Sequence, residues 1–433
     1  MLPTWNDDAI NQRLEKYGRF GVHLGLERIQ RLLAALDHPE KSVPVVHVAG
    51  SNGKGSVCAY VASALRAAGY RVGRYTSPHL VSWGERIWVD GAAIAPAALA
   101  AVLSQVEAAI APDGEPPTQF EVFTAAAWLY FAQQAVDVAV IEVGLGGRLD
   151  ATNVVDDPLV TVIVSLSLEH WQRLGPTLAD IAREKAGILK PRRPAVIGPL
   201  PPEAEAVVLA RAATLECPLV RPQPAQPIDS NRVRYRPSDP DQPELDYFLN
   251  LEGQHQLTNS AIAIATLYAL RDQGWQLSDQ AIQDGMAQAQ WPGRLQWLTW
   301  HAPGGTTHRW LIDGAHNPAA AQVLRAYVDT LAPPAVTWLL GMLTTKDHAD
   351  VLRALLRPGD RLHLVPVPDH SSMEPEALRA IALAVCPDLG ACLTYPTLRA
   401  GLTVASQEEA PLRVLCGSLY LIGHFLGTET TSA

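Results

Sequence analysis

The segment Gly50-Ser51-Asn52-Gly53-Lys54-Gly55-Ser56 is the most informative sign of the fold in the first half of this chain. It follows the apolar run 43–48, which is typical of a buried strand, and it precedes the helical stretch 57–68. A strand that enters a glycine-rich turn and leaves it as a helix is the arrangement of a phosphate-binding loop. The sequence therefore predicts an α/β domain that binds a nucleotide.

The residue types in this loop suit phosphate. Glycines let backbone N–H groups wrap phosphate oxygens, and Lys54 can neutralise the β- and γ-phosphates. The loop departs from the strict Walker form because Gly55 separates Lys54 from the hydroxyl of Ser56. A plain strand–helix connection is the alternative. The candidate ATP-binding residues here are Gly50, Asn52, Gly53, Lys54, Gly55 and Ser56.

Three more runs in the first half favour strands, namely residues 71–75, 136–143 and 159–165, and residues 120–134 and 177–188 favour helices. This alternation predicts a mainly parallel, doubly wound sheet. Each strand runs directly into a polar or glycine-rich segment, so the four loops should meet at the carboxyl edge of the sheet, where ligands collect. Residues 191–247 are rich in proline, and we interpret them as irregular and peripheral.

The alternation restarts after a helix over residues 259–271 and the turn Trp291-Pro292-Gly293, which we interpret as a linker. Strands are predicted at 309–312, 336–340, 361–365 and 413–416, and helices at 318–331, 347–356 and 374–385. We predict two domains: an N-terminal P-loop parallel-sheet domain over 1–293 and a smaller C-terminal Rossmann-like α/β domain over 294–433.

Composition excludes several classes of partner. A formal net charge of -10 argues against a nucleic-acid partner, and we find no apolar run of the ~20 residues that a membrane span needs. Residues 1–13 are mixed polar, unlike a signal peptide. The cysteines are odd in number and scattered, which favours reduced thiols in the cytoplasm. They are Cys58, Cys217, Cys386, Cys392 and Cys416.

Three polar residues follow predicted strands and suit a metal ion that accompanies the nucleotide. Glu142 ends the run 136–143, Ser77 follows 71–75, and His170 follows 159–165. Mg²⁺ prefers hard oxygen ligands, which Glu142 and Ser77 offer. Taken singly, each has a simpler explanation: Glu142 as a cap or ion-pair partner, Ser77 as a turn residue, and His170 as the partner of a backbone group.

Nine segments together resemble folylpolyglutamate and dihydrofolate synthases, the folate branch of the Mur ligase family. They are HVAGSNGKGS (47–56), TSPHL (76–80), EVGLGGRLDATN (142–153), IAREKAGI (181–188), GQHQLTN (253–259), WPGRLQ (291–296), DGAHNP (313–318), GMLTTKDH (341–348) and CGSL (416–419). Their order spans nearly the whole chain. Glu169 stands where the family usually has Asp, and Ser51 where it usually has Thr; both keep the functional group.

The resemblance implies a monomeric ligase that uses ATP to add L-glutamate to dihydropteroate, to the γ-glutamyl tail of reduced folates, or to both, through an acyl phosphate. It implies two Mg²⁺ sites held by Ser77, Glu142, His170 and a carbamylated Lys185. Lys54, Lys185 and His170 are then the catalytic candidates. Without the resemblance, Lys185 would be a cation at a helix end.

The resemblance also assigns ATP contacts to Asn259, Arg294, Asp313 and His316. It places the pterin near Phe120, Asp150 and Ala151, with an N-terminal loop at residues 21–29. A pterin needs an apolar surface against its ring and acceptors for its N–H groups. Phe120 has a simpler alternative as a core residue. Individual roles for Asn317, Ser418, Lys346 and Asp347 stay open.

Two rival functions remain. One is a ligase of the same fold that acts on another acid, such as a cell-wall precursor; the form of segment 142–153 argues against it. The other is a P-loop ATPase that performs no ligation. Nucleotide turnover without an acid and an amino acid would favour this second rival.

Overall fold

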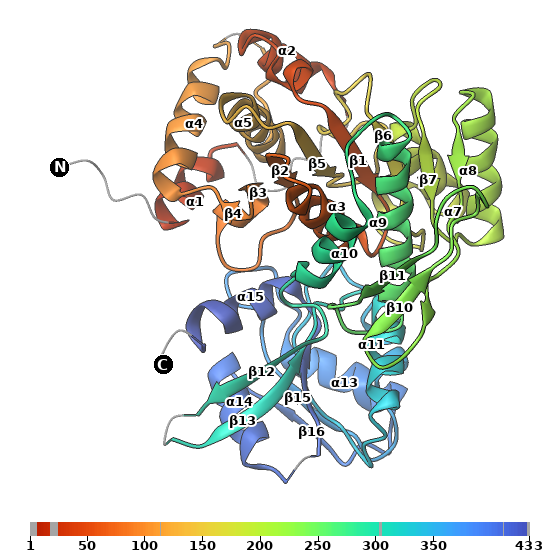
Figure 1. Cartoon of the computed structure of the whole chain (residues 1–433). Helices are drawn as coiled ribbons and strands as arrows, with labels where there is room; N and C mark the ends of the chain where they lie inside the picture. Colours follow the sequence, from red (N-terminus) through yellow and green to blue (C-terminus); the bar gives the residue numbers. More distant parts are fainter. Residues whose placement is uncertain (1–6, 18–24, 113, 303–304, 410, 431–433) are drawn as a thin grey trace. The chain divides into compact units, whose positions relative to one another are not determined.

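The computed structural model describes residues 7–17, 25–112, 114–302, 305–409 and 411–430, and it divides into two compact units (Figure 1). Unit 1 takes its described residues from Met1–Asn250 and Gln256–Gln290, and unit 2 takes them from Leu251–His255 and Trp291–Ala433. Each unit is built around its own large sheet. The predicted α/β architecture is confirmed.

Unit 1 contains an eight-stranded sheet. In spatial order its strands are β4 (Ala92–Ala93), β3 (Ile87–Val89), β2 (Val72–Tyr75), β5 (Val138–Glu142), β1 (Val45–Ala49), β6 (Val160–Ile163), β7 (Ala195–Ile197) and β8 (Leu219–Val220). Strands β2, β5, β1, β6, β7 and β8 are parallel to one another. Strands β3 and β4 add an antiparallel hairpin beside β2. The four strands predicted around the phosphate loop are adjacent and parallel, which confirms that their loops share one edge. Both edge strands are only two residues long.

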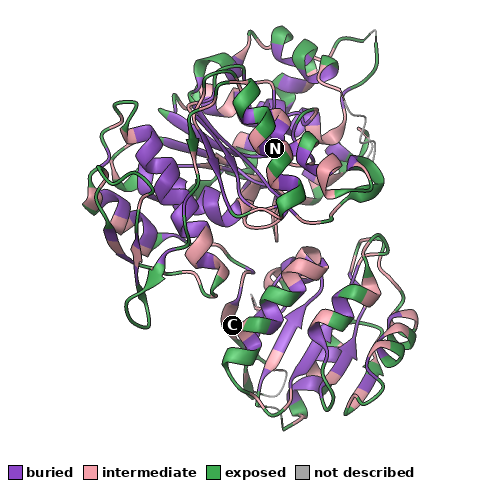
Figure 2. Cartoon of the chain, turned by 90° about the vertical axis from the view of Figure 1, so that its right-hand side faces the viewer, coloured by how far each residue is buried: buried purple, intermediate pink, exposed green. Residues whose placement is uncertain are grey.

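Helices cover both faces of this sheet. On one face lie α3 (Lys54–Ala67), α9 (His255–Arg271) and α10 (Asp279–Gln288); a Cβ at Gly285 of α10 would lie 2.2 Å from the Cα of Ala64 in α3. The other face carries α2 (Glu27–Ala35), α4 (Pro96–Ala108), α5 (Gln119–Gln133), α7 (Leu178–Lys185) and α8 (Pro202–Thr214). Shorter elements are α1 (Asp7–Glu15), α6 (Trp171–Leu174), η1 (Pro39–Ser42), η2 (Trp83–Arg86) and η3 (Ala186–Ile188). Figure 2 shows the strands buried and the outer sides of the helices exposed.

The interpretation of residues 191–247 as irregular is wrong. They contain β7, α8 and β8 of unit 1, and then a three-stranded antiparallel sheet of β9 (Gln226–Pro227), β10 (Arg232–Tyr235) and β11 (Leu245–Phe248). The high proline content did not indicate irregular structure, because Pro201 and Pro202 occupy the N-cap and first turn of α8. At that position a helix loses no hydrogen bond to proline.

Unit 2 contains a six-stranded sheet in the order β12 (Gln296–His301), β13 (Thr307–Ile312), β17 (Arg413–Cys416), β14 (Thr337–Leu340), β15 (Arg361–Leu364) and β16 (Ala391–Thr394). Only β12 is antiparallel to its neighbour. The helices are α11 (Pro318–Thr330), α12 (His348–Leu355), α13 (Pro375–Val385), α14 (Leu398–Gln407) and α15 (Leu419–Thr428).

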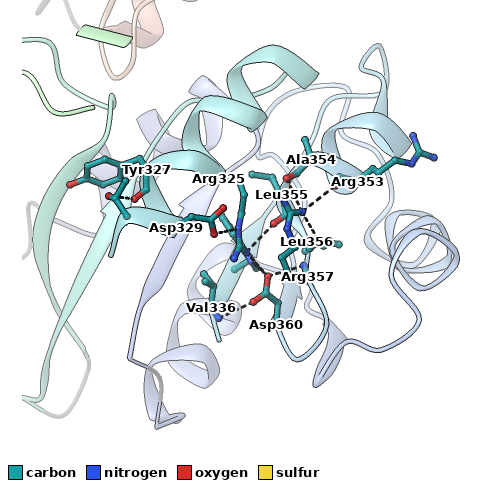
Figure 3. A network of polar contacts seen from close by, with 12 residues as sticks. Arg325, Tyr327, Asp329, Val336, Arg353, Ala354, Leu355, Leu356, Arg357 and Asp360 are labelled. Carbon is teal, nitrogen blue, oxygen red and sulfur yellow. Dashed lines mark hydrogen bonds and ion pairs between the residues drawn. The ribbon is translucent and has the colours of Figure 1, made fainter. Parts of the chain in front are cut away.

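A buried carboxylate organises the amino edge of the unit 2 sheet. Asp360, which directly precedes β15, accepts hydrogen bonds from Arg325 Nη1 at 2.9 Å and Trp338 Nε1 at 3.0 Å. It also accepts the backbone N–H groups of Val336 and Arg357, each at 3.0 Å. Figure 3 shows Asp360 with Arg325, Val336 and Arg357. A buried charge with this many donors stabilises the ends of several elements at once.

Two general features concern the described part of the chain. None of the helices within these residues combines the length and the apolar character that crossing a bilayer requires. All five cysteines are free thiols, and four of them are buried.

Candidate active site

The carboxyl edge of the unit 1 sheet gathers the segments that follow β1, β2, β5 and β6. These strands are neighbours in the order β2-β5-β1-β6. The phosphate loop follows β1, Ser77 follows β2, Glu142 ends β5, and Ser165 follows β6. The parallel register therefore brings segments that are far apart in sequence to one place.

The glycines of the phosphate loop are required by its geometry. Gly50 and Gly53 have φ values of 154° and 84°, a region that favours glycine. A Cβ at Gly53 would lie 2.6 Å from Asn259 Oδ1 and 2.9 Å from Val164 Cγ1. Helix α3 begins at Lys54, so the backbone N–H groups of its first turn lack helical partners and are directed at the loop. The loop is therefore shaped to receive an anion.

Ser165 anchors the loop from the neighbouring strand. Its hydroxyl accepts the N–H of Asn52 at 3.1 Å and donates to the Asn52 carbonyl at 2.9 Å. The N–H of Ser51 donates to the Ser165 carbonyl at 2.7 Å. Sequence reasoning missed Ser165 as a site residue. Its position at the end of the predicted strand 159–165, at the shared edge, was the available signal.

Lys54 lies over its own loop. Its Nζ donates to the carbonyls of Gly50 at 3.0 Å and Ser51 at 3.3 Å, and it lies 3.8 Å from Glu142 Oε1. Glu142 is buried, and its second oxygen accepts the N–H of Ser77 at 3.2 Å. A cation suited to phosphate and a carboxylate suited to a divalent cation therefore meet at the mouth of the loop.

Lys185 is a buried lysine that joins this group. It is the last residue of α7, only 4% of it is exposed, and its Nζ donates to the Gly50 carbonyl at 2.8 Å. Burial and, to a smaller extent, the nearby charge of Lys54 lower the pKa of Lys185 to about 7, while the carboxylates of Glu169, Asp150 and Glu142 oppose this shift. Much of this amine is therefore neutral at pH 7. The simpler interpretation as a solvated helix-end cation does not describe it.

His170 lies at the beginning of α6, with its side chain 42% exposed and its Nε2 3.3 Å from Glu169 Oε1. Among the described residues, no three His, Cys, Asp or Glu side chains form a group that could hold a metal ion. The Glu142 carboxylate and Ser77 hydroxyl nevertheless supply the hard oxygens that Mg²⁺ prefers. The donor chemistry fits Mg²⁺, and Lys185 would need an added oxygen to take part.

The three predicted pterin residues lie around segment 142–153. Phe120, half-buried at the start of α5, packs on Gly144 so closely that a Cβ there would lie 2.4 Å from Phe120 Cζ. Ala151 belongs to the hydrophobic core cluster against which Phe120 packs. Asp150 is buried, which raises the pKa of its carboxyl, while bonds from Thr152 and the Leu145 N–H oppose that rise. The core interpretation therefore accounts for part of the Phe120 surface, since the residue is only half-buried.

A buried ion pair that the sequence analysis missed supports Phe120. Arg28 Nε in α2 lies 3.2 Å and 3.1 Å from the two carboxylate oxygens of Glu121. Glu121 also accepts the N–H of Thr118 at 2.7 Å, which closes the capping box of α5. The pair thus fixes the helix end that carries Phe120. Of the predicted N-terminal loop, residues 21–24 lie outside the described residues.

In unit 2, three predicted residues meet where β13 ends. Asp313 accepts the N–H groups of Leu295 at 2.9 Å and Ala315 at 2.8 Å. Burial raises the pKa of Asp313, and Arg294 opposes that rise. His316 Nδ1 hydrogen-bonds the Gly314 carbonyl at 2.8 Å. Asn259, the fourth predicted ATP residue, lies in unit 1, where its Nδ2 donates to Gln256 Oε1 at 3.1 Å.

The residues whose roles stayed open lie at helix starts in unit 2. Asn317 caps α11 by accepting the Ala320 N–H at 2.8 Å. Ser418 caps α15 by accepting the Tyr420 N–H at 3.2 Å. Asp347 occupies the N-cap position of α12, directly after Lys346. These contacts describe local structure and assign no ligand.

Comparison with known protein families places this geometry among folate enzymes. A family model described as "Dihydrofolate synthetase, C-terminal domain" matches residues 296–428. The folylpolyglutamate synthase of Lacticaseibacillus casei is 38% identical over 362 residues, covering 81% of this chain and 83% of that protein. The dihydrofolate synthase/folylpolyglutamate synthase of Escherichia coli is 34% identical over 411 residues, covering 94% and 91%.

Solved structures show the same similarity. E. coli FolC in complex with DHPP and ADP superposes with a TM-score of 0.84 at 33% identity, covering 97% of this chain and 96% of that one. Mycobacterium tuberculosis folylpolyglutamate synthase complexed with ADP and AMPPCP gives 0.81 at 31%, covering 98% of both chains. A bifunctional folylpolyglutamate synthase/dihydrofolate synthase with Mn, AMPPNP and L-glutamate bound gives 0.81 at 30%, covering 98% and 99%.

Proposed function

The chain belongs to the folylpolyglutamate synthase/dihydrofolate synthase family, and from this premise we propose that it joins L-glutamate to a pteroate-type acid at the expense of ATP. The acid is dihydropteroate, the γ-glutamyl tail of a reduced folate, or both. One observation in this chain supports the proposal above others. The amines of Lys54 and Lys185 both donate to the carbonyl of Gly50 in the phosphate loop, and Glu142 Oε1 lies 3.8 Å from Lys54 Nζ.

The chemistry runs in two steps. A carboxylate oxygen of the acid attacks the γ-phosphorus of ATP, ADP leaves, and an acyl phosphate forms. The neutral amine of glutamate then attacks the acyl carbon, phosphate leaves with the C–O bond electrons, and the nitrogen releases one proton as the amide forms. Lys54 and the first-turn N–H groups of α3 balance the negative charge that develops in the first step.

Metal binding is a further part of the proposal. Glu142, Ser77 and His170 would hold Mg²⁺, which supplies charge neutralisation to the phosphates. We propose that Lys185 carries a carbamate: its neutral amine attacks carbon dioxide, a C–N bond forms, and a proton is released. The product is an anionic oxygen ligand beside Glu142, suited to a second Mg²⁺. The burial of Lys185 supports this because burial favours the neutral amine.

The remaining site residues are assigned within each unit. We assign ATP contacts to Asn259 in unit 1, and to Arg294, Asp313 and His316 in unit 2. We assign the acid to Phe120, Asp150 and Ala151, where the ring would take the flat heterocycle and the carboxylate its N–H donors. This group is supported by the packing of Phe120 on Gly144.

Two properties of the molecule complete the proposal. Its five free thiols support a reducing compartment, and we place the protein in the cytoplasm. We further propose that it acts as a monomer, which light scattering of the purified protein tests directly.

The test of function is product formation. Purified protein is incubated with ATP, Mg²⁺ and L-glutamate, together with dihydropteroate or with tetrahydrofolate, and the mass of the acid is followed. We expect the acid to gain one glutamyl residue in step with ADP release, and Lys54→Ala to lose both. ADP release that needs neither acid nor glutamate would establish a non-ligating ATPase. Product formation with tetrahydrofolate and glutamate, but none with dihydropteroate and glutamate, would restrict the enzyme to extension of existing glutamyl tails.

A further inference from the structure

Three polar side chains form a hydrogen-bonded chain inside unit 1, and they connect strand β1 to segment 142–153. His47 Nε2 lies 2.9 Å from Thr152 Oγ1, and Thr152 Oγ1 lies 2.6 Å from Asp150 Oδ1. His47 and Thr152 are fully buried, and Asp150 is 5% exposed.

The distances fix the direction of the hydrogen bonds. The Thr152 hydroxyl has one proton, and a 2.6 Å contact to a carboxylate is the charge-assisted O–H···O⁻ bond. Thr152 Oγ1 must then accept from His47, which places the ring proton on Nε2. Burial lowers the pKa of His47 to about 3, so the ring is neutral, and its Nδ1 is an acceptor without a hydrogen-bond partner.

The opposite arrangement is disfavoured. If Thr152 donated to His47, the ring proton would move to Nδ1, and a buried N–H would have no acceptor. Buried N–H groups without partners are rarer than acceptors without partners. Asp150 would also lose its shortest hydrogen bond.

The position of His47 in the sheet does not call for a polar side chain. On the same strand and the same face, Val45 and Ala49 belong to hydrophobic core clusters. Replacing a buried polar group by a well-packed apolar one is often neutral or stabilising. The polar chain therefore has a role other than stability. It ties β1, which runs into the phosphate loop, to Asp150.

Resting on the function proposed above, we propose that His47 is a positioning residue of the acid-binding site, which acts through Thr152 to keep Asp150 a hydrogen-bond acceptor. Asp150 Oδ1 is taken by the hydroxyl and N–H of Thr152, at 2.6 Å and 3.0 Å. Oδ2 accepts the Leu145 N–H at 2.8 Å, and the backbone N–H of Gly144 also hydrogen-bonds the Asp150 carboxylate.

The test compares four variants in the ligation assay with dihydropteroate. His47→Phe keeps the flat ring without a donor, and His47→Gln restores a donor at the Nε2 position. Thr152→Val removes the middle hydroxyl. Thr161→Val is the matched control, because it removes a buried hydroxyl that donates to the Pro194 carbonyl just before the neighbouring strand β7.

We expect His47→Phe and Thr152→Val each to raise KM for dihydropteroate about tenfold, the fold-change of one hydrogen bond, while KM for ATP changes less than about twofold. The double variant should match either single variant, His47→Gln should recover most of the loss, and Thr161→Val should leave both KM values unchanged. Ring ¹⁵N–¹H correlation spectra of the wild type should show the His47 proton on Nε2.

Three results would overturn the inference. They are an Nδ1–H tautomer, equal changes in KM for dihydropteroate and ATP, or additive effects in the double variant. If His47→Phe fails to fold, the Thr152→Val kinetics and the wild-type spectrum still test the role of His47. Failure of the proposed function is a different outcome, in which the wild type itself forms no glutamylated product.

Discussion

Replacing Lys185 by methionine should stabilise unit 1 at neutral pH while it removes ligase activity. Methionine has nearly the same length and volume and carries no charge. Lys185 is 4% exposed, and burial lowers its pKa from 10.5 to about 7. Keeping an ammonium at this position therefore costs about 5 kcal/mol, at 1.36 kcal/mol per pKa unit.

The direction of the pH dependence of the unfolding free energy follows from proton binding. Because the pKa of Lys185 is lower in the folded chain, the unfolded chain binds more protons between pH 7 and 10.5, and the free energy of unfolding rises with pH in that window. From pH 7 to pH 8.5 this contribution grows by roughly 1.6 kcal/mol. At pH 7 the methionine variant gains about 4 kcal/mol and loses about 1 kcal/mol with the hydrogen bond to the Gly50 carbonyl. We expect a net gain of about 3 kcal/mol.

The assay is urea unfolding followed by circular dichroism at pH 7.0 and 8.5, without nucleotide or metal, in buffer freed of carbon dioxide so that the amine stays unmodified. Lys41→Met, at an exposed lysine of the same unit, is the control for loss of a positive charge. The wild type should approach the stability of Lys185→Met as pH rises, and Lys41→Met should run parallel to the wild type. A difference between wild type and Lys185→Met that stays constant with pH would show that Lys185 keeps its ordinary pKa in the folded chain.

Three further substitutions test other parts of the molecule. Lys54→Ala should leave a folded protein whose kcat falls more than about a hundredfold, because the cation at the phosphates is lost; a fall of less than about threefold, which is ~0.7 kcal/mol, contradicts the phosphate-loop assignment. Gly53→Ala should raise KM for ATP at least about tenfold, since the added Cβ would lie 2.6 Å from Asn259 Oδ1; unchanged ATP kinetics would show that the loop tolerates it. Asp360→Ala should lower the unfolding free energy of unit 2 by about 3–5 kcal/mol, because it leaves the buried Trp338 Nε1 and the Val336 N–H without an acceptor and takes one of two carboxylate partners from Arg325; urea unfolding that matches the wild type contradicts that account.

Local sequence rules predicted the part of the fold that surrounds the phosphate loop. Apolar runs of strand length, each leading into a polar or glycine-rich segment, identified β1, β2, β5 and β6 and their common edge. The rules failed where proline was taken as a sign of irregular structure, since Pro202 begins α8 as a helix-compatible residue. A proline at a helix start and one in a loop look alike until the following periodicity is weighed.

Residue motifs pointed to segments of the site, but the contacts within it depend on register. The sequence gives no sign that Lys185 and Lys54 donate to the same carbonyl, since 131 positions separate them. The same holds for the pair Arg28–Glu121 and for the bond between His47 and Thr152, residues 93 and 105 positions apart. Such contacts arise only when strands pair and helices dock, so no local pattern encodes them.

The ends of the unit 1 sheet carry a consequence for how the protein behaves in a crowded solution. A sheet edge exposes a row of unpaired N–H and C=O groups, onto which a strand of another molecule can add. Here β4 and β8 are two residues long, so each edge offers a foreign strand only a few backbone partners. An intruding strand would gain too little hydrogen bonding to offset the entropy of its own ordering. The short edge strands β4 and β8 therefore protect the large sheet of unit 1 from intermolecular β-aggregation.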